Sequence, residues 1–125
     1  MPAHSEPICI LDDDPSVRNS IEQLLDSDDL RAQSFEDAED FLSHARCHPV
    51  PLALLDFWMA KMNGLEVQSR LRDLSPGTKV IIMTGRETPT IRAAALEGGA
   101  FAFLVKPFDD AAFLLLVRQA LDFAA

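Results

Sequence analysis

Residues 79–84 read KVIIMT, and this short run decides the fold class. Its apolar and largely β-branched residues follow one another without the polar alternation of a half-exposed strand. Such runs are typical of parallel strands that are covered by helices on both faces. The turn residues SPG at 75–77 separate the run from the segment before it. The sequence therefore predicts a buried parallel strand here, with helices on both sides of its sheet.

Four further strands are expected from similar runs. They cover residues 7–11 (PICIL), 30–35 (LRAQSF, the weakest), 51–55 (PLALL) and 101–105 (FAFLV). The segments between the strands carry apolar stripes at helical spacing, namely Val17, Ile21, Leu24 and Leu25, then Ala38, Phe41, Leu42 and Ala45, then Val67, Leu71 and Leu74. Five βα units with short, right-handed connections predict an α/β fold, a doubly wound open parallel sheet with helices on both faces.

Helix starts are marked by a capping residue that precedes proline. The dipeptides DP at 14–15 and TP at 88–89 each place an N-cap before the first helical position. The second helix is expected to start after Ser34 or Glu36, and the last helix to begin at about Asp109.

Length and composition bound the function. A chain of 125 residues, 48% apolar and 25% charged, fits one globular domain that spans 1–125. No apolar run approaches the roughly 18–20 residues of a membrane span, so a cytoplasmic protein without membrane contact is expected. A formal net charge of −9 argues against direct nucleic-acid binding, which needs clusters of Lys and Arg. Cys9 and Cys47 stand apart and are expected to be reduced thiols.

Polar side chains collect where the predicted strands end. Asp12 and Asp13 follow the first strand and Asp56 follows the third, while Thr84 ends the fourth and Lys106 follows the fifth. Ligands of open α/β sheets bind at the carboxyl ends of the strands, so these side chains are expected in one site. Close carboxylates repel one another unless a cation lies among them, and oxygen ligands favour Mg²⁺. A carboxylate nucleophile beside a metal and a lysine suits phosphoryl transfer that forms an acyl phosphate.

Each of these residues also has an ordinary structural explanation. Asp14 is more readily a helix cap than a ligand, and Asp12 or Asp13 alone is a common turn residue. Thr84 and Lys106, taken singly, are common in strands and at strand ends. Their joint placement at one edge of the sheet favours the functional interpretation.

Four motifs then appear in order: ILDDDPSVR (10–18), LLDFWMAKMNGLE (54–66), VIIMTG (80–85) and FLVKPFD (103–109). They resemble the motifs of the receiver domain of bacterial two-component response regulators. The fuller pattern is similar to receivers of the nitrogen-fixation type of transcriptional regulator. The resemblance extends from about Ile8 to Leu121 and implies a flavodoxin-like five-stranded sheet in the order 2-1-3-4-5.

The resemblance also implies a phosphoacceptor and a metal site. Asp56 would receive a phosphoryl group from a phosphohistidine on a sensor histidine kinase. Asp13, the Asp56 side chain and the backbone carbonyl of Trp58 would hold Mg²⁺, and Asp12 would act largely through metal-bound water.

Further roles follow from the same resemblance. Thr84 and Lys106 would bind the phosphoryl oxygens, and Thr84 and Phe103 would form the switch, with Phe103 turning inward on activation. The bond between Lys106 and Pro107 would be cis, and X-Pro is the only common place for a cis bond. The domain would be a phosphorylation-controlled switch that catalyses only its own phosphorylation and dephosphorylation, rather than a conventional enzyme.

Two features depart from the family pattern. Ala60 stands where the family usually has proline, so the loop after the third strand is expected to be somewhat freer. Trp58 and Arg86 lie two residues past Asp56 and Thr84. We expect this pair to flank the site, to restrict attacking water and to slow hydrolysis of the acyl phosphate.

The last helix carries more leucine than one buried stripe needs. Leu114, Leu115 and Leu116 add apolar side chains around the helix, which favours a protein contact over simple core packing. In the family the fourth helix, fifth strand and fifth helix form the dimer or output face, so a homodimer contact is one expectation. Such regulators usually carry a helix-turn-helix output domain after the receiver. A stand-alone receiver and a piece of a longer regulator both stay open.

Two other classes of protein are weighed against this one. A phosphatase that forms an aspartyl phosphate also uses Asp and Mg²⁺, but it needs a second acid two residues past the nucleophile, where Trp58 stands. A receiver-like module that no longer takes phosphate is disfavoured by the intact set of three acids, one threonine and one lysine.

Overall fold

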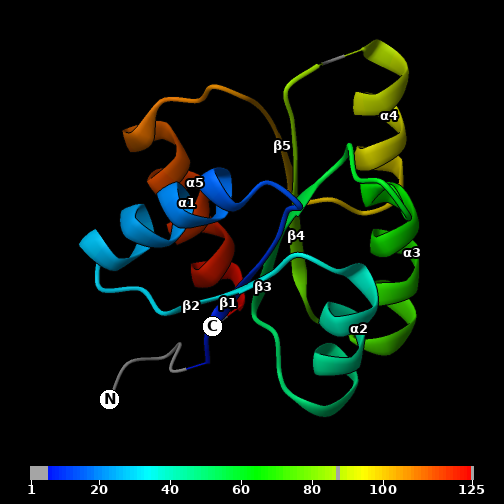
Figure 1. Cartoon of the computed structure of the whole chain (residues 1–125), viewed down its shortest axis with the longest axis horizontal. Helices are drawn as coiled ribbons and strands as arrows, with labels where there is room; N and C mark the ends of the chain where they lie inside the picture. Colours follow the sequence, from blue (N-terminus) through cyan, green and yellow to red (C-terminus); the bar gives the residue numbers. More distant parts are fainter. Residues whose placement is uncertain (1–5, 87, 125) are drawn as a thin grey trace.

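A computed structural model describes residues 6–86 and 88–124, and its fold is a five-stranded parallel sheet with helices on both faces (Figure 1). The strand order is β2-β1-β3-β4-β5, as the family resemblance implied. In chain order the elements are β1 (Ile8–Leu11), α1 (Pro15–Ser27), β2 (Ala32–Phe35), α2 (Ala38–Cys47), β3 (Leu52–Asp56), α3 (Gly64–Leu74), β4 (Lys79–Thr84), α4 (Pro89–Glu97), β5 (Ala102–Val105) and α5 (Asp110–Ala124). None of the helices among these residues is long and apolar enough to cross a membrane.

The interior strand β4 shows why the sheet is buried on both sides. Val80 and Ile82 pack into the core under α2, α3 and α4, whereas Ile81 and Met83 pack into the core under α1 and α5. Figure 1 shows the same division, with α1 and α5 on one face of the sheet and the other three helices opposite. A continuous apolar run is needed because successive side chains of a strand point to opposite faces.

Most predicted helix starts are confirmed. The Asp14 carboxylate caps α1, and the Thr88 hydroxyl accepts a hydrogen bond from the backbone N–H of Ile91 at the start of α4. The expected start of α2 was wrong, because Asp37 is its N-cap and accepts from the N–H of Asp40. Ser34 instead lies within β2, where its hydroxyl bonds to Glu22 of α1.

The start of α3 is packed directly against the end of β3. The N–H of Gly64 donates to the carbonyl of Phe57 over 3.0 Å. A Cβ atom at position 64 would lie 2.9 Å from the carbonyl oxygen of Asp56 and 3.0 Å from the Cα of Phe57. Both are backbone atoms that have little freedom to move. Glycine is therefore required here by a close approach of two chain segments.

Replacing Gly64 with alanine should shift this contact. We expect Gly64→Ala to lower the free energy of unfolding by about 1–3 kcal/mol, although alanine is the better helix former. Gly77→Ala is the matched control, because nothing lies within 4 Å of a Cβ at that position. Urea unfolding of the three proteins measures the difference; equal loss in both variants would contradict a special constraint at Gly64.

Candidate functional site

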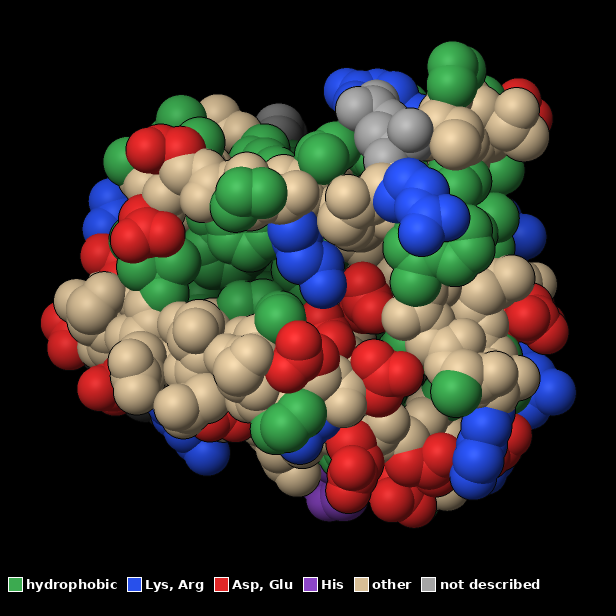
Figure 2. Space-filling view, turned by 45° about the horizontal axis from the view of Figure 1, so that its top comes forward, with side chains coloured by type: hydrophobic (Ala, Val, Ile, Leu, Met, Phe, Trp, Pro, Cys, Tyr) green, Lys and Arg blue, Asp and Glu red, His purple; other side chains and the backbone are tan. Residues whose placement is uncertain are grey.

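Three carboxylates meet where β1 and β3 end. Asp12 and Asp56 are buried and Asp13 is exposed. Each offers a carboxylate oxygen, and these oxygens lie within 4.8 Å of one another. Figure 2 shows acidic side chains gathered near the middle of this face, with a basic side chain beside them. The juxtaposition predicted from the strand ends is thus present.

Lys106, at the end of β5, partly neutralises this group. Its Nζ atom lies 3.0 Å from an Asp12 oxygen and 3.0 Å from an Asp56 oxygen, so one ammonium bridges both buried acids. Burial acts to lower the pKa of Lys106, but the hydrogen bonds and charges of Asp12 and Asp56 outweigh burial and raise it. Lys106 therefore stays protonated. The peptide bond between Lys106 and Pro107 is cis, as predicted.

One lysine does not balance three acids. The pKa of Asp56 is raised from 3.8 to about 6, chiefly because the carboxyl is buried and also because Asp12 and Asp13 carry like charge. Lys106 opposes this rise without cancelling it. The site holds excess negative charge on oxygen ligands, which is the chemistry that suits a hard divalent cation.

Local hydrogen bonds hold the acids in place. One Asp12 carboxylate oxygen accepts the N–H of Asp14 at 2.9 Å, and the Asp12 carbonyl accepts from Arg18 at 2.6 Å. Asp14 in turn accepts from the backbone N–H of Ser16 at 2.9 Å, so it serves as the helix cap. Asp14 thus caps helix α1, while the carboxylates of Asp12, Asp13 and Asp56 lie close to one another.

Thr84 is fully buried at the end of β4, but its hydroxyl is engaged in the following turn. It donates to the carbonyl of Arg86 at 2.8 Å and accepts the N–H of Arg86 at 3.1 Å. Binding a phosphoryl oxygen through this hydroxyl proton requires the bond to the Arg86 carbonyl to break. The position of Thr84 at a strand end predicted that it lies at the site, but no feature of the sequence predicted the competing bond to Arg86.

Trp58 and Arg86 contact each other. The guanidinium carbon of Arg86 lies 5.4 Å from the centre of the Trp58 ring, within the range of a cation–π interaction. Trp58 is 47% exposed, and its ring also packs edge-on against the Phe57 ring, with 4.6 Å between the ring centres. The two residues that sequence spacing set beside the site thus form one pair.

The other predicted switch and interface residues differ in burial. Phe103 lies inward, buried within β5, with the guanidinium of Arg92 5.5 Å from its ring centre. Leu115 is 57% exposed, while Leu114 and Leu116 are half-buried against the core under α1 and α5. The three leucines are therefore not all buried in the core, and the Leu115 side chain is exposed and accessible to another protein.

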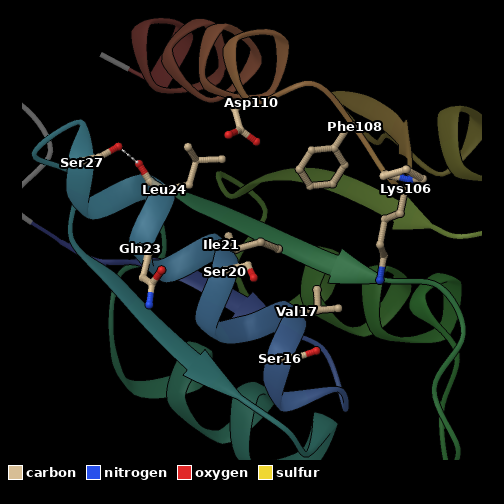
Figure 3. A pocket seen from close by; sticks show the side chains of 11 residues that line it. Ser16, Val17, Ser20, Ile21, Gln23, Leu24, Ser27, Lys106, Phe108 and Asp110 are labelled. Atoms are coloured by element: carbon tan, nitrogen blue, oxygen red, sulfur yellow. Dashed lines mark hydrogen bonds between the residues drawn. The ribbon is translucent and has the colours of Figure 1, made fainter.

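A hollow beside Lys106 could not be recognised in the sequence. It has a volume of about 760 Å³ and lies between α1 and the connection that leads from β5 to α5. Figure 3 shows Val17, Ile21 and Leu24 of α1 along one side, with Phe108 and Lys106 across from them. Figure 2 shows it as a depression with a hydrophobic floor. The residues that line it come from segments far apart in the sequence. The apolar Phe108 after the Lys-Pro dipeptide was the one feature of the sequence that could have indicated an apolar hollow here.

Comparison with known proteins finds a family that matches most of the chain. The model of the response regulator receiver domain matches residues 8–118. The chain is 36% identical over 125 residues to the transcriptional regulatory protein FixJ of Azorhizobium caulinodans, covering 97% of this chain and 57% of that protein. It is 34% identical over 116 residues to the C4-dicarboxylate transport transcriptional regulatory protein DctD of Pseudomonas aeruginosa, covering 92% of this chain and 25% of that protein.

A solved structure shows the same architecture. The response regulator receiver domain protein (CheY-like) from Methanospirillum hungatei has a TM-score of 0.90 and 28% identity, with 95% of each chain covered. The chain belongs to the response regulator receiver domain family. It is a receiver domain of two-component response regulators, and the likeness to FixJ confirms the predicted similarity to nitrogen-fixation regulators. It spans 57% or less of the length of FixJ and of DctD.

The raised pKa of Asp56 makes stability depend on pH. Between the unfolded value of 3.8 and the folded value of about 6, the folded protein binds the extra proton, so stability falls as pH rises. Asp56→Asn removes this loss. With a chelator present, the free energy of unfolding of the wild type should fall relative to that of Asp56→Asn by roughly 2–3 kcal/mol between about pH 4 and pH 7. Urea unfolding across this range measures it, and a constant difference would contradict the raised pKa.

Proposed function

We propose that Asp56 accepts a phosphoryl group from a phosphohistidine on a sensor histidine kinase, and that this switches the face formed by α4, β5 and α5. The switched face controls an output domain, for which we infer a transcriptional role, or a separate partner. The observation that carries this proposal is the buried Asp56 carboxylate held by Lys106 within a group of three acids.

Mg²⁺ is the proposed cofactor. Asp13, the Asp56 side chain and the backbone carbonyl of Trp58 would hold it, with Asp12 acting mainly through metal-bound water. The fit rests on the three carboxylates and on the raised pKa of Asp56, which reflects burial and excess negative charge. When bound, Mg²⁺ supplies positive charge that lets the carboxylates and an incoming phosphoryl group approach.

The proposed reaction transfers a phosphoryl group from a histidine nitrogen to a carboxylate oxygen of Asp56. The N–P bond of the phosphohistidine breaks, an Asp56 carboxylate oxygen forms the new O–P bond, and the imidazole leaves with its nitrogen lone pair. Lys106 is already 3.0 Å from Asp56 and would pair with a phosphoryl oxygen. Thr84 would release the Arg86 carbonyl and donate to another oxygen. Rearrangement at Thr84 and Phe103 would then change the outer face.

A turnover enzyme is a weaker interpretation of the same residues. An aspartyl-phosphate phosphatase would need an acid two residues past the nucleophile, and the residue there is Trp58, paired with Arg86. Asp56, Thr84 and Lys106 would act only on the domain's own acyl phosphate. We therefore propose a switch that catalyses its own phosphorylation and dephosphorylation.

Phosphorylation of Asp56 is directly testable. The protein is incubated with Mg²⁺ and acetyl phosphate, and mass spectrometry locates any added phosphoryl group. We expect a label on Asp56 that is absent from Asp56→Asn and strongly reduced in Asp13→Asn. Asp73→Asn, at an exposed acid of α3, is the control and should label like the wild type. An unlabelled Asp56, under conditions that phosphorylate another receiver, would overturn the proposal.

Trp58 and Arg86 are proposed to control water at the acyl phosphate. The Trp58 ring and the Arg86 guanidinium pair with each other and stand two residues past Asp56 and Thr84, where they would restrict the approach of water to phosphorus. We expect Trp58→Ala to hydrolyse its acyl phosphate about tenfold faster, which corresponds to about 1.4 kcal/mol of barrier. Trp58→Phe keeps an aromatic ring and should show a smaller change. A rate in Trp58→Ala that is equal to or below that of the wild type would refute this role.

The face formed by α4, β5 and α5 is the proposed contact surface, with a second copy of the chain as partner. Its support is the 57% exposure of Leu115 next to the half-buried Leu114 and Leu116. We expect Leu115→Glu to prevent dimers that form when the protein is treated with Mg²⁺ and beryllofluoride. Gln33→Glu, on the opposite edge strand β2, should leave them intact. Sedimentation velocity gives the answer, and unchanged dimers in Leu115→Glu would exclude this surface.

A further inference from the structure

Gln68 is a buried polar residue of α3 that the phosphorylation site does not use. Its side-chain amide donates to the carbonyl of Ala95 in α4 over 3.1 Å. It is only 4% exposed, and Ala95 is the buried residue of α4. A buried amide is costly unless it is hydrogen-bonded, so this contact fixes where the two helices meet.

Two neighbouring residues strengthen the same junction. Arg72, four residues further along α3, donates to the carbonyl of Gly98 over 2.8 Å. Gly98 ends α4 with ordinary helical dihedral angles, so its backbone does not demand glycine. A Cβ at position 98 would, however, lie 3.1 Å from the side-chain oxygen of Gln68. The missing side chain at Gly98 makes room for Gln68.

The opposite end of α3 is packed against the phosphoacceptor strand. Gly64, Gln68 and Arg72 are spaced four residues apart and so lie along one side of the helix. Gly64 contacts the backbone of Asp56, and Gln68 and Arg72 reach the C-terminal end of α4. One rigid helix thus joins the end of β3 to the far end of α4.

The N-terminal end of α4 is connected differently. Thr84 ends β4 and Thr88 caps α4, so the two are close in the sequence, and the Thr84 side chain is bonded to the backbone of Arg86. A change at Thr84 would therefore act on the start of α4, whereas the end of α4 is bound to α3.

We propose that Gln68 is a positioning residue of the switch: it holds the C-terminal end of α4 on α3, so that the N-terminal end of α4 moves about this fixed end when Thr84 releases Arg86. The proposal rests on the proposed function, because phosphorylation of Asp56 is what draws Thr84 away from Arg86. It adds a second connection between the site and α4, made through α3.

Amide hydrogen exchange of the full chain, with Mg²⁺ and with or without beryllofluoride, tests the proposal. In the wild type, beryllofluoride should change exchange in residues 85–93 and leave residues 97–100 unchanged. Gln68→Leu keeps the side-chain volume, and the Ala95 carbonyl retains its bond from the N–H of Ala100 at 3.0 Å, so the fold should persist. In this variant residues 97–100 should exchange roughly 2- to 10-fold faster, and beryllofluoride should now change both ends of α4.

Matched variants separate positioning from general loss of stability. Gly98→Ala should displace the Gln68 side chain and reproduce the effect of Gln68→Leu, and the double variant should add little more. Gln23→Leu, the same substitution at an exposed position of α1, should match the wild type throughout. A merely structural role for Gln68 would speed exchange in α1 and α5 as well and would leave the beryllofluoride response confined to residues 85–93.

Two further results would overturn the proposal, and they have different meanings. Unchanged exchange of residues 97–100 in Gln68→Leu, with a normal beryllofluoride response in the wild type, would refute the role of Gln68 alone. A wild type that shows no beryllofluoride response anywhere would contradict the proposed phosphorylation together with the movement of α4.

Discussion

Repulsion among three carboxylates at one edge of the sheet is the constraint on which the rest of the structure depends. Asp12 and Asp56 are buried and share one ammonium, and Asp13 adds a third negative charge at the surface. Lys106 holds the two buried acids together but leaves the pKa of Asp56 raised, because burial and like charge outweigh its attraction. The site is thus poised to take up positive charge, which a divalent cation provides.

The packing of the sheet keeps the repelling carboxylates close together. β1 and β3 are paired neighbours whose residues are buried throughout, so their carboxyl ends cannot move apart to relieve it. Gly64 allows α3 to begin against the backbone of Asp56, which adds a further restraint. An apolar, tightly packed sheet of this kind holds the charged groups at one edge with little freedom to move.

Much of the fold could be read from particular runs of residues. KVIIMT predicted β4 with both of its ends, and the pairs Asp14-Pro15 and Thr88-Pro89 predicted two helix starts. The start of α2 was misplaced because Ser34 and Asp37 are both good caps, and the bond from Ser34 to Glu22 depends on how β2 packs beside α1. Local signals suffice where a cap and a helix are adjacent, and fail where tertiary packing chooses between caps.

The site was predictable for a related reason. Strand ends in a parallel sheet meet at one edge, so the order of the strands along the chain is enough to bring Asp12, Asp56 and Lys106 together. The competing bond of Thr84, the hollow beside Phe108 and the junction at Gln68 could not be predicted, because each depends on side-chain packing between elements. A glutamine on a helix is ordinarily a surface residue, and the burial of Gln68 is explained by its bond to the Ala95 carbonyl and by the space that Gly98 leaves.

The charge imbalance at Asp56 is most directly tested by carboxyl-carbon NMR. Titration of the metal-free protein should give Asp56 a midpoint near 6, and added Mg²⁺ should move that midpoint well below its metal-free value. The exposed Asp73 carboxyl serves as an internal control that Mg²⁺ should not shift. An Asp56 that titrates near 3.8 without metal and does not respond to Mg²⁺ would contradict the charge imbalance on which the proposed phosphorylation of Asp56 rests.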